Sequence, residues 1–137
     1  MARYDLDGNV LWELTGMSTI DIPSPFAGHG LLFVNSGYVA DALRPVYAIR
    51  PGASGDISLK SDEASNPFIA WSNSTLGSYN PSSLVYGDYY YTLHDRGFFT
   101  ANESQDRAAG LWPPADLGRG QWILRVPPGR ITGRSLR

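Results

Sequence analysis

The segment SPFAGHGLLFV at residues 24–34 aligns without gaps to SSLVYGDYYYT at residues 82–92. Each copy starts with a small residue and continues through a short apolar run, two turn-forming residues and a second apolar run. Short β-branched and aromatic runs between Gly, Asp, Asn and Pro are typical of β-strands joined by tight turns. The sequence therefore predicts one β-hairpin that occurs twice, 58 positions apart.

The repeat extends on both sides of this hairpin. YAI at residues 47–49 matches FFT at residues 98–100 at an offset of 51, and we assign the seven-residue difference to an insertion at residues 35–44. Trp12 and Trp71 lie 59 positions apart, each at the end of a predicted strand. Without insertions, the repeating unit approaches the ~40–45 residues of a four-stranded propeller blade.

Further apolar runs bounded by turn residues predict an all-β fold. The expected strands lie at residues 10–12, 31–34, 46–49, 68–71, 84–86, 89–92 and 97–100. The polar stretch at residues 52–66 is expected to be a surface excursion that lengthens the first copy. Windows with helical spacing are too short to form stable helices by themselves.

The composition is that of a globular chain of about one domain. The 137 residues are 42% hydrophobic and 18% charged, with 15 Gly and 10 Pro. Apolar runs stay well short of the ~18 residues of a membrane span, and the first residues lack the pattern of a signal peptide. The chain has no Cys, which excludes disulfides, thiolate metal sites and Cys nucleophiles.

The charge is unevenly distributed along the chain. Residues 1–106 carry five basic and twelve acidic side chains, whereas residues 107–137 carry six Arg and one Asp. We do not expect nucleic-acid binding, because the body is acidic and the Arg residues are spread among Pro and Gly. Residues 107–137 show no strand pattern, and we expect an irregular tail that is disordered or translated out of frame.

The order of these motifs resembles the quinoprotein-like (PQQ-like) β-propeller repeat family. YDLDGNVLW at residues 4–12 resembles the family's LDxxTGxxLW strand-turn-strand. The hairpin at residues 24–34 resembles the SPxxxxGxxYV start of a blade, and residues 97–100 resemble the GxLxAL third strand. Three features depart from the family pattern: a shortened turn at Gly8, Ser83 in place of Pro, and a second copy without its closing Trp.

The resemblance implies a partial β-propeller of antiparallel four-stranded blades within residues 1–106. The expected parts are a blade end at 4–16, a blade at 22–73 and a partial blade at 80–101. The resemblance makes Trp12 and Trp71 structural wedges between blades. The glycines expected to have structural roles are Gly8, Gly30, Gly87 and Gly97. It also implies a periplasmic or extracytoplasmic location.

The candidate chemical groups are better explained as structural residues. His29 is expected as an exposed turn residue. His94 and Asp95 are neighbours whose side chains should point to opposite faces and so not pair. Asp5 and Asp7 mimic the start of a calcium loop, but the Glu expected at its twelfth position is missing, so we interpret both as turn formers.

The three consecutive tyrosines could form a stacking surface for sugars or bases. Strand alternation places Tyr90 on one face and its two neighbours on the other. We therefore expect Tyr90 to pack between blades.

Three functions stay open at this point. The sequence favours a non-catalytic module that binds a protein or ligand, with other blades or a protein as partners and no assigned cofactor or metal. The first alternative is a fragment of a quinone-dependent dehydrogenase, whose PQQ and Ca²⁺ are implied by the family alone. The second alternative is a carbohydrate-binding β-domain. Because closing a propeller takes at least four blades, we expect the isolated chain to be marginally stable, to self-associate or to need a longer parent.

Overall fold

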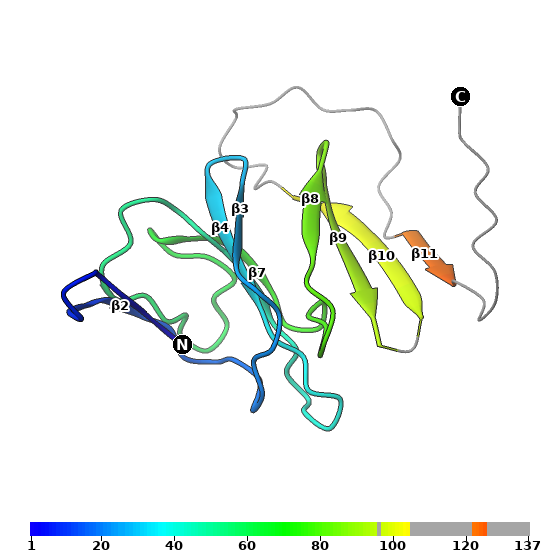
Figure 1. Ribbon diagram of the computed structural model, residues 1–137, viewed down its shortest axis with the longest axis horizontal. Helices are drawn as coiled ribbons and strands as arrows, with labels where there is room; N and C mark the ends of the chain where they lie inside the picture. Colours follow the sequence, from blue (N-terminus) through cyan, green and yellow to red (C-terminus); the bar gives the residue numbers. More distant parts are fainter. Residues whose placement is uncertain (96, 105–121, 126–137) are drawn as a thin grey trace.

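The structure is a computed structural model that describes residues 1–95, 97–104 and 122–125. This part of the chain is all-β, as the sequence predicts, and forms three sheets (Figure 1). Within the described ranges, no helix is long and apolar enough to cross a membrane.

The strands form one three-stranded and two four-stranded sheets. The first sheet has the order β1 (Ala2–Tyr4), β2 (Val10–Glu13), β6 (Gly55–Asp56). The second sheet has the order β3 (Phe26–Gly28), β4 (Leu31–Asn35), β5 (Val46–Ile49), β7 (Ile69–Asn73). The third sheet has the order β8 (Leu84–Tyr86), β9 (Tyr89–His94), β10 (Phe98–Glu103), β11 (Trp122–Arg125). Every pairing is antiparallel except that of β2 with β6.

The predicted repeat of the hairpin is confirmed residue for residue. Phe26 pairs with Phe33 in β3–β4, and their counterparts 58 positions later, Leu84 and Tyr91, pair in β8–β9. Both hairpins have two-residue turns, which require positive φ angles to match the twist of the strands. His29 and Gly30 have φ angles of 50° and 74° in the first turn, and Gly87 has a φ of 56° in the second.

The predicted offset of the third strand is wrong by two residues. Phe33 pairs with Ala48, and its counterpart Tyr91 pairs with Ala101. Ala48 and Ala101 are 53 positions apart, so the insertion between β4 and β5 is five residues long rather than seven. Side chains alternate with a period of two along a strand, and the error therefore leaves every residue on the correct face.

The expectation that residues 107–137 contain no strand is also wrong. β11 pairs with β10 and completes the third sheet. Trp71 lies opposite Ala48, and Trp122 lies opposite Ala101, the counterpart of Ala48. Trp122 thus occupies the register position of the closing Trp that the second copy was expected to lack. Two physical features favour this pairing: β10 would otherwise leave its backbone groups unpaired at a sheet edge, and Trp, Ile and Leu follow in succession here.

The rest of the predicted tail, residues 107–121 and 126–137, lies outside the described residues. That these residues are translated from a shifted reading frame stays a hypothesis.

The polar stretch at residues 52–66 is more than a surface excursion. Its strand β6 pairs with β2, and Ile57 directly after it is fully buried between the first two sheets. Asn66 anchors the end of the stretch, because its Nδ2 donates to the carbonyl of Ile57 at 3.0 Å. The stretch therefore covers the edge of β2 and adds to the core.

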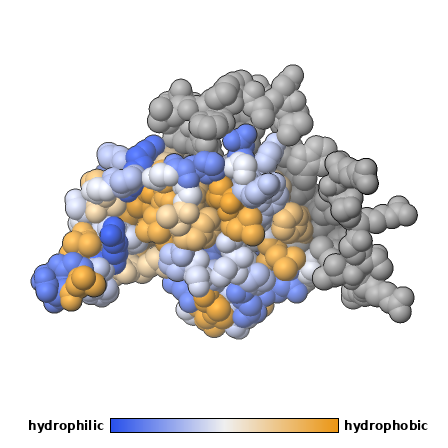
Figure 2. All heavy atoms as spheres, turned by 45° about the horizontal axis from the view of Figure 1, so that its top comes forward, coloured by the Kyte–Doolittle hydropathy of each residue, from blue (hydrophilic) through white to orange (hydrophobic). Residues whose placement is uncertain are grey.

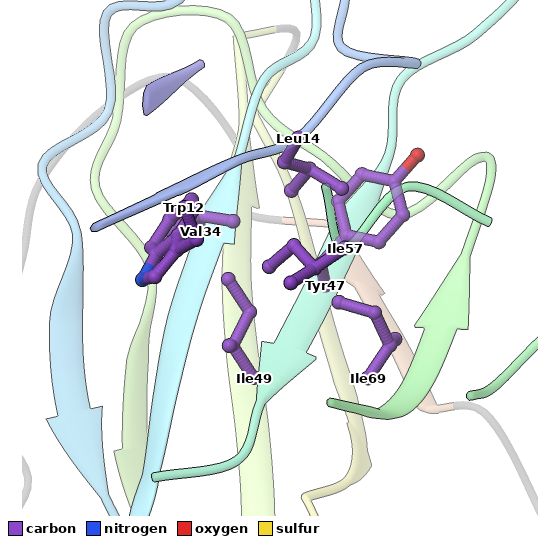
Figure 3. Packing of buried hydrophobic residues seen from close by; sticks show 7 residues of the cluster. All are labelled: Trp12, Leu14, Val34, Tyr47, Ile49, Ile57 and Ile69. Carbon is purple, nitrogen blue, oxygen red and sulfur yellow. The ribbon is translucent and has the colours of Figure 1, made fainter. Parts of the chain in front are cut away.

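Two cores join the three sheets into a stack. The core between the first and second sheets is drawn in Figure 3 and contains Trp12, Leu14, Val34, Tyr47, Ile49, Ile57 and Ile69. The core between the second and third sheets contains Phe33, Val46, Ala48, Ala70, Leu76 and Tyr90. The second sheet is thus covered on both faces. The finer prediction, that this stack is part of a propeller, stays a prediction.

Candidate binding sites

A mostly apolar pocket opens between the first and second sheets. It has a volume of about 280 Å³ and is lined by Arg3, Trp12, Ala27, Gly30, Leu31, Leu32, Ile49, Arg50, Pro51 and Ala53. The charged groups of this lining are the guanidinium groups of Arg3 and Arg50. Ligand pockets commonly combine apolar walls with a few placed polar groups, and this one would suit an apolar body that carries a negative charge.

The two arginines reach the pocket from different sheets. Arg3 is exposed on β1, directly opposite Trp12 in the register. Arg50 follows β5, and its Nη1 donates to the carbonyl of Asn66 at 2.8 Å. The Asn66 side chain in turn accepts from the backbone N–H groups of Phe68 and Ile69. Arg50 is therefore held in place, whereas Arg3 lies at the open side.

A cluster of polar side chains is buried between the second and third sheets. Asn35 Nδ2 donates to Ser83 Oγ at 2.7 Å and to the Tyr90 hydroxyl at 2.8 Å, and Ser83 Oγ lies 3.2 Å from Thr92 Oγ1. Asn35 Oδ1 is buried without a hydrogen-bond partner. Burial raises the pKa of Tyr90, and the hydrogen bonds from its neighbours oppose the rise. The unpaired Oδ1 of Asn35 costs free energy of folding unless an ordered water donates a hydrogen bond to it.

His94 and Asp95 do not form a pair, as predicted. His94 Nε2 lies 3.2 Å from Thr100 Oγ1, whereas the Asp95 carboxylate accepts from the backbone N–H of Tyr79 at 3.1 Å and from the side chain of Asn80 at 2.9 Å. Burial and the positive charge of Arg44 lower the pKa of His94, and Asp95 only partly offsets them. His94 is therefore held neutral beside a hydroxyl and is better described as a packing residue.

His29 connects the two copies of the hairpin. It lies in the β3–β4 turn, and its ring Nε2 is 2.8 Å from the carbonyl oxygen of Gly87 in the β8–β9 turn. A carbonyl can only accept, so Nε2 carries the proton and donates. The backbone N–H of Ser24 likewise donates to Ser82 Oγ at 3.1 Å. Both contacts join residues 58 positions apart, so counterparts in the repeat touch each other.

The two predicted wedge residues lie in successive cores. Trp12 is 2% exposed and belongs to the core between the first and second sheets. Trp71 is half-buried against the next core, where its ring stands perpendicular to that of Tyr90 with the ring centroids 6.0 Å apart. Its Nε1 donates to the carbonyl of Ser104 at 3.0 Å. The expected structural glycines Gly8, Gly30, Gly87 and Gly97 have φ angles of 85°, 74°, 56° and 75°.

The acidic residues near the N-terminus form a turn. The Asp5 carboxylate accepts from the backbone N–H groups of Asp7 and Asn9 and from Asn9 Nδ2. Hydrogen bonds from Asn9 and its neighbours lower the pKa of Asp5. Across residues 1–95, 97–104 and 122–125, no three His, Asp or Glu side chains gather into a group that could hold a metal ion.

The outer face of the third sheet carries a group of aromatic and aliphatic side chains. As predicted, Tyr90 is buried in the core and Tyr89 and Tyr91 lie on the opposite face. The ring of Tyr91 stacks on that of Phe99 with the centroids 5.4 Å apart, and its centroid lies 6.2 Å from that of the Tyr89 ring. Tyr86, 77% exposed, pairs with Tyr89 on this face. Apolar residues also gather across the middle of the surface drawn in Figure 2.

No known protein family, curated protein or solved structure is detectably similar to this chain. The resemblance to quinoprotein-like repeats therefore stays a hypothesis, and a function has to be argued from the geometry. The sequence interpretation missed both Arg3 and Arg50 as pocket residues and Asn35 as the centre of the buried polar cluster. Ser83 was the one local signal for that cluster, because a polar residue stands there in place of the expected Pro.

Proposed function

We propose that this chain is a non-catalytic binding module whose scaffold is a partial β-propeller. Blades of a propeller pack face to face because the sheet of one blade cannot bury both its faces. The observation that supports the proposal best is the set of contacts between counterparts 58 positions apart, Ser24 with Ser82 and His29 with Gly87. Adjacent blades related by a repeating rotation bring counterparts together in this way.

The closing tryptophans support the same arrangement. Trp12 in β2 of the first sheet packs toward the second sheet, and Trp71 in the edge strand β7 of the second sheet packs toward the third. Trp122 occupies the same register position in the third sheet. Trp71 and Trp122 thus share one register position in the second and third sheets, and Trp12 packs between the first sheet and the second.

The pocket between the first two sheets is the proposed ligand-binding site. Trp12, Leu31 and Ile49 provide apolar wall, and Arg3 lies at the side open to water. A guanidinium binds a carboxylate or sulfonate through charge-assisted hydrogen bonds, which are stronger than neutral ones. The ligand class that fits best is a small molecule with an apolar body and one negative charge.

Binding of 8-anilinonaphthalene-1-sulfonate to the native chain tests this proposal, because the probe combines an aromatic body with one sulfonate. We expect saturable binding that Arg3→Gln weakens about tenfold, equivalent to ~1.4 kcal/mol. Ala27→Phe should abolish binding by filling the pocket. The matched control is Lys60→Gln, which removes one exposed positive charge outside the pocket lining and should leave the affinity unchanged.

Binding that is insensitive to Arg3→Gln and Ala27→Phe would show that the probe binds elsewhere and would refute the proposed binding site. Thermal melts of each variant show whether it is folded under the assay conditions.

A further inference from the structure

We propose that copies of this chain associate end to end, with the outer face of the third sheet of one copy against the outer face of the first sheet of the next. The inference rests on the proposed repeat scaffold. It names a second copy of the chain as the partner.

The outer face of the third sheet is the counterpart of a face that is covered elsewhere in the chain. In the second sheet, Phe26 and Phe33 pack against Tyr90 of the third sheet at ring distances of 6.0 and 5.5 Å. Their counterparts Leu84 and Tyr91 pair with each other on the opposite side of the third sheet from Tyr90. The face that covers the next sheet in one repeat thus occurs again in the following repeat.

Large apolar side chains on this face are accessible to water. Leu84 and Tyr86 are both exposed, as is Leu93 near the end of β9. Contiguous exposed apolar groups of this kind commonly mark interaction sites. Their exposure indicates that the face is available for a partner.

The first sheet exposes the complementary face. Arg3 lies opposite Trp12 and shares the pocket side of the sheet with it. The register shifts between Arg3 and Tyr4, and the extra residue lies in β2, where alternation is interrupted between Val10 and Trp12. β1 has no extra residue, so its own alternation places Tyr4 on the other side from Arg3, away from the second sheet. Tyr4 is 58% exposed, and its register partner Val10 is exposed as well. Neither residue belongs to a core cluster.

The internal interfaces decide how these two faces fit. In each, the face of one sheet that carries the closing Trp covers the opposite face of the following sheet. The third sheet exposes the face that covers a following sheet elsewhere in the chain. The first sheet exposes the face that a preceding sheet covers elsewhere in the chain. Two different faces that fit each other give a head-to-tail interface rather than a self-complementary one.

Sedimentation velocity on the full chain and two Tyr→Lys variants tests this inference. We expect the mass of the wild-type species to rise from one chain to two or more as the concentration increases. Tyr86→Lys blocks the face on the third sheet, and Tyr4→Lys blocks the face on the first. Each variant alone should stay monomeric. Leu43→Lys, an exposed leucine in the loop between β4 and β5, is the control and should associate like the wild type.

Mixing the two variants distinguishes head-to-tail pairing from other modes. Each variant keeps the face that the other has lost, so an equimolar mixture should form a one-to-one dimer that does not grow further. Three outcomes would each overturn the inference: a wild-type chain that is monomeric throughout, association that survives either Tyr4→Lys or Tyr86→Lys, or a mixture that stays monomeric. None of them affects the probe-binding test of the pocket, so the two proposals fail separately.

Discussion

Replacing Trp12 by alanine is expected to lower the free energy of unfolding by about 3–5 kcal/mol, the usual cost of removing a large buried aromatic side chain. Trp12 is nearly inaccessible to water and packs in the core that joins the first two sheets. Its loss opens a cavity beside Val34 and Ile49 and leaves the first sheet poorly attached. Denaturant unfolding followed by far-UV circular dichroism measures the change.

The matched control for this variant is Leu6→Ala in the same N-terminal hairpin. Leu6 is fully exposed, so its truncation should change the free energy of unfolding by less than about 0.5 kcal/mol. A Trp12→Ala variant as stable as the control would show that the first sheet does not pack on the second as described.

A single methyl group at Gly77 is expected to destabilise the chain by about 3 kcal/mol, the upper end of the range for overpacking. A Cβ at Gly77 would overlap the carbonyl oxygen of Ser36 and lie 2.8 Å from that of Pro45 and 2.9 Å from that of Arg44. All three atoms are backbone, so no side chain can turn aside to make room. The measurement is the shift of the denaturation midpoint in Gly77→Ala.

Gly28→Ala controls for the general effect of replacing a glycine. A Cβ at Gly28 would meet Val85 at 3.4 Å and Phe33 at 3.7 Å, which are ordinary packing distances. Gly28 lies in β3, and a side chain there should be neutral or slightly stabilising. Equal effects of the two substitutions would contradict the close approach of the loop around Ser36 to Gly77.

The hairpin repeat could be predicted from the sequence because its signals are local. The turn residues His29 and Gly30 and the second copy's Gly87 set equal loop lengths, so the apolar runs on both sides align without a gap. The register of the third strand was harder to predict, because the insertion before Val46 changes its distance in sequence from the hairpin. Matching apolar residues then finds the correct face but not the correct register, since faces repeat every two residues.

The strand at Trp122 and the burial of Ile57 escaped prediction for a different reason. Each is a short apolar feature within a polar or Arg- and Pro-rich stretch, and each becomes part of the structure by pairing with or packing on an element distant in sequence. Sheet edges supply that pairing, and a local pattern carries no information about a free edge elsewhere in the chain. The pocket at Arg3 and Arg50 is non-local in the same sense, because its walls come from two sheets.

The central claim, that successive copies of the repeat stack with counterparts in contact, is tested most directly by a disulfide between Ser24 and Ser82. The chain has no cysteine, so the variant with Ser24→Cys and Ser82→Cys contains one possible intramolecular bond. Ser24 N and Ser82 Oγ are 3.1 Å apart, and both residues are exposed to the oxidant.

The control pair is Ser58→Cys with Ser82→Cys. Ser58 accepts a hydrogen bond from Thr15 beside the first sheet, on the other side of the second sheet from Ser82. Under mild oxidation of dilute protein, the account predicts that the Ser24–Ser82 pair closes nearly completely. Closure should stabilise the native chain by about 2–4 kcal/mol. The control pair should stay reduced. A Ser24–Ser82 pair that stays reduced, or that closes only on unfolding, would contradict the stacking of the repeats.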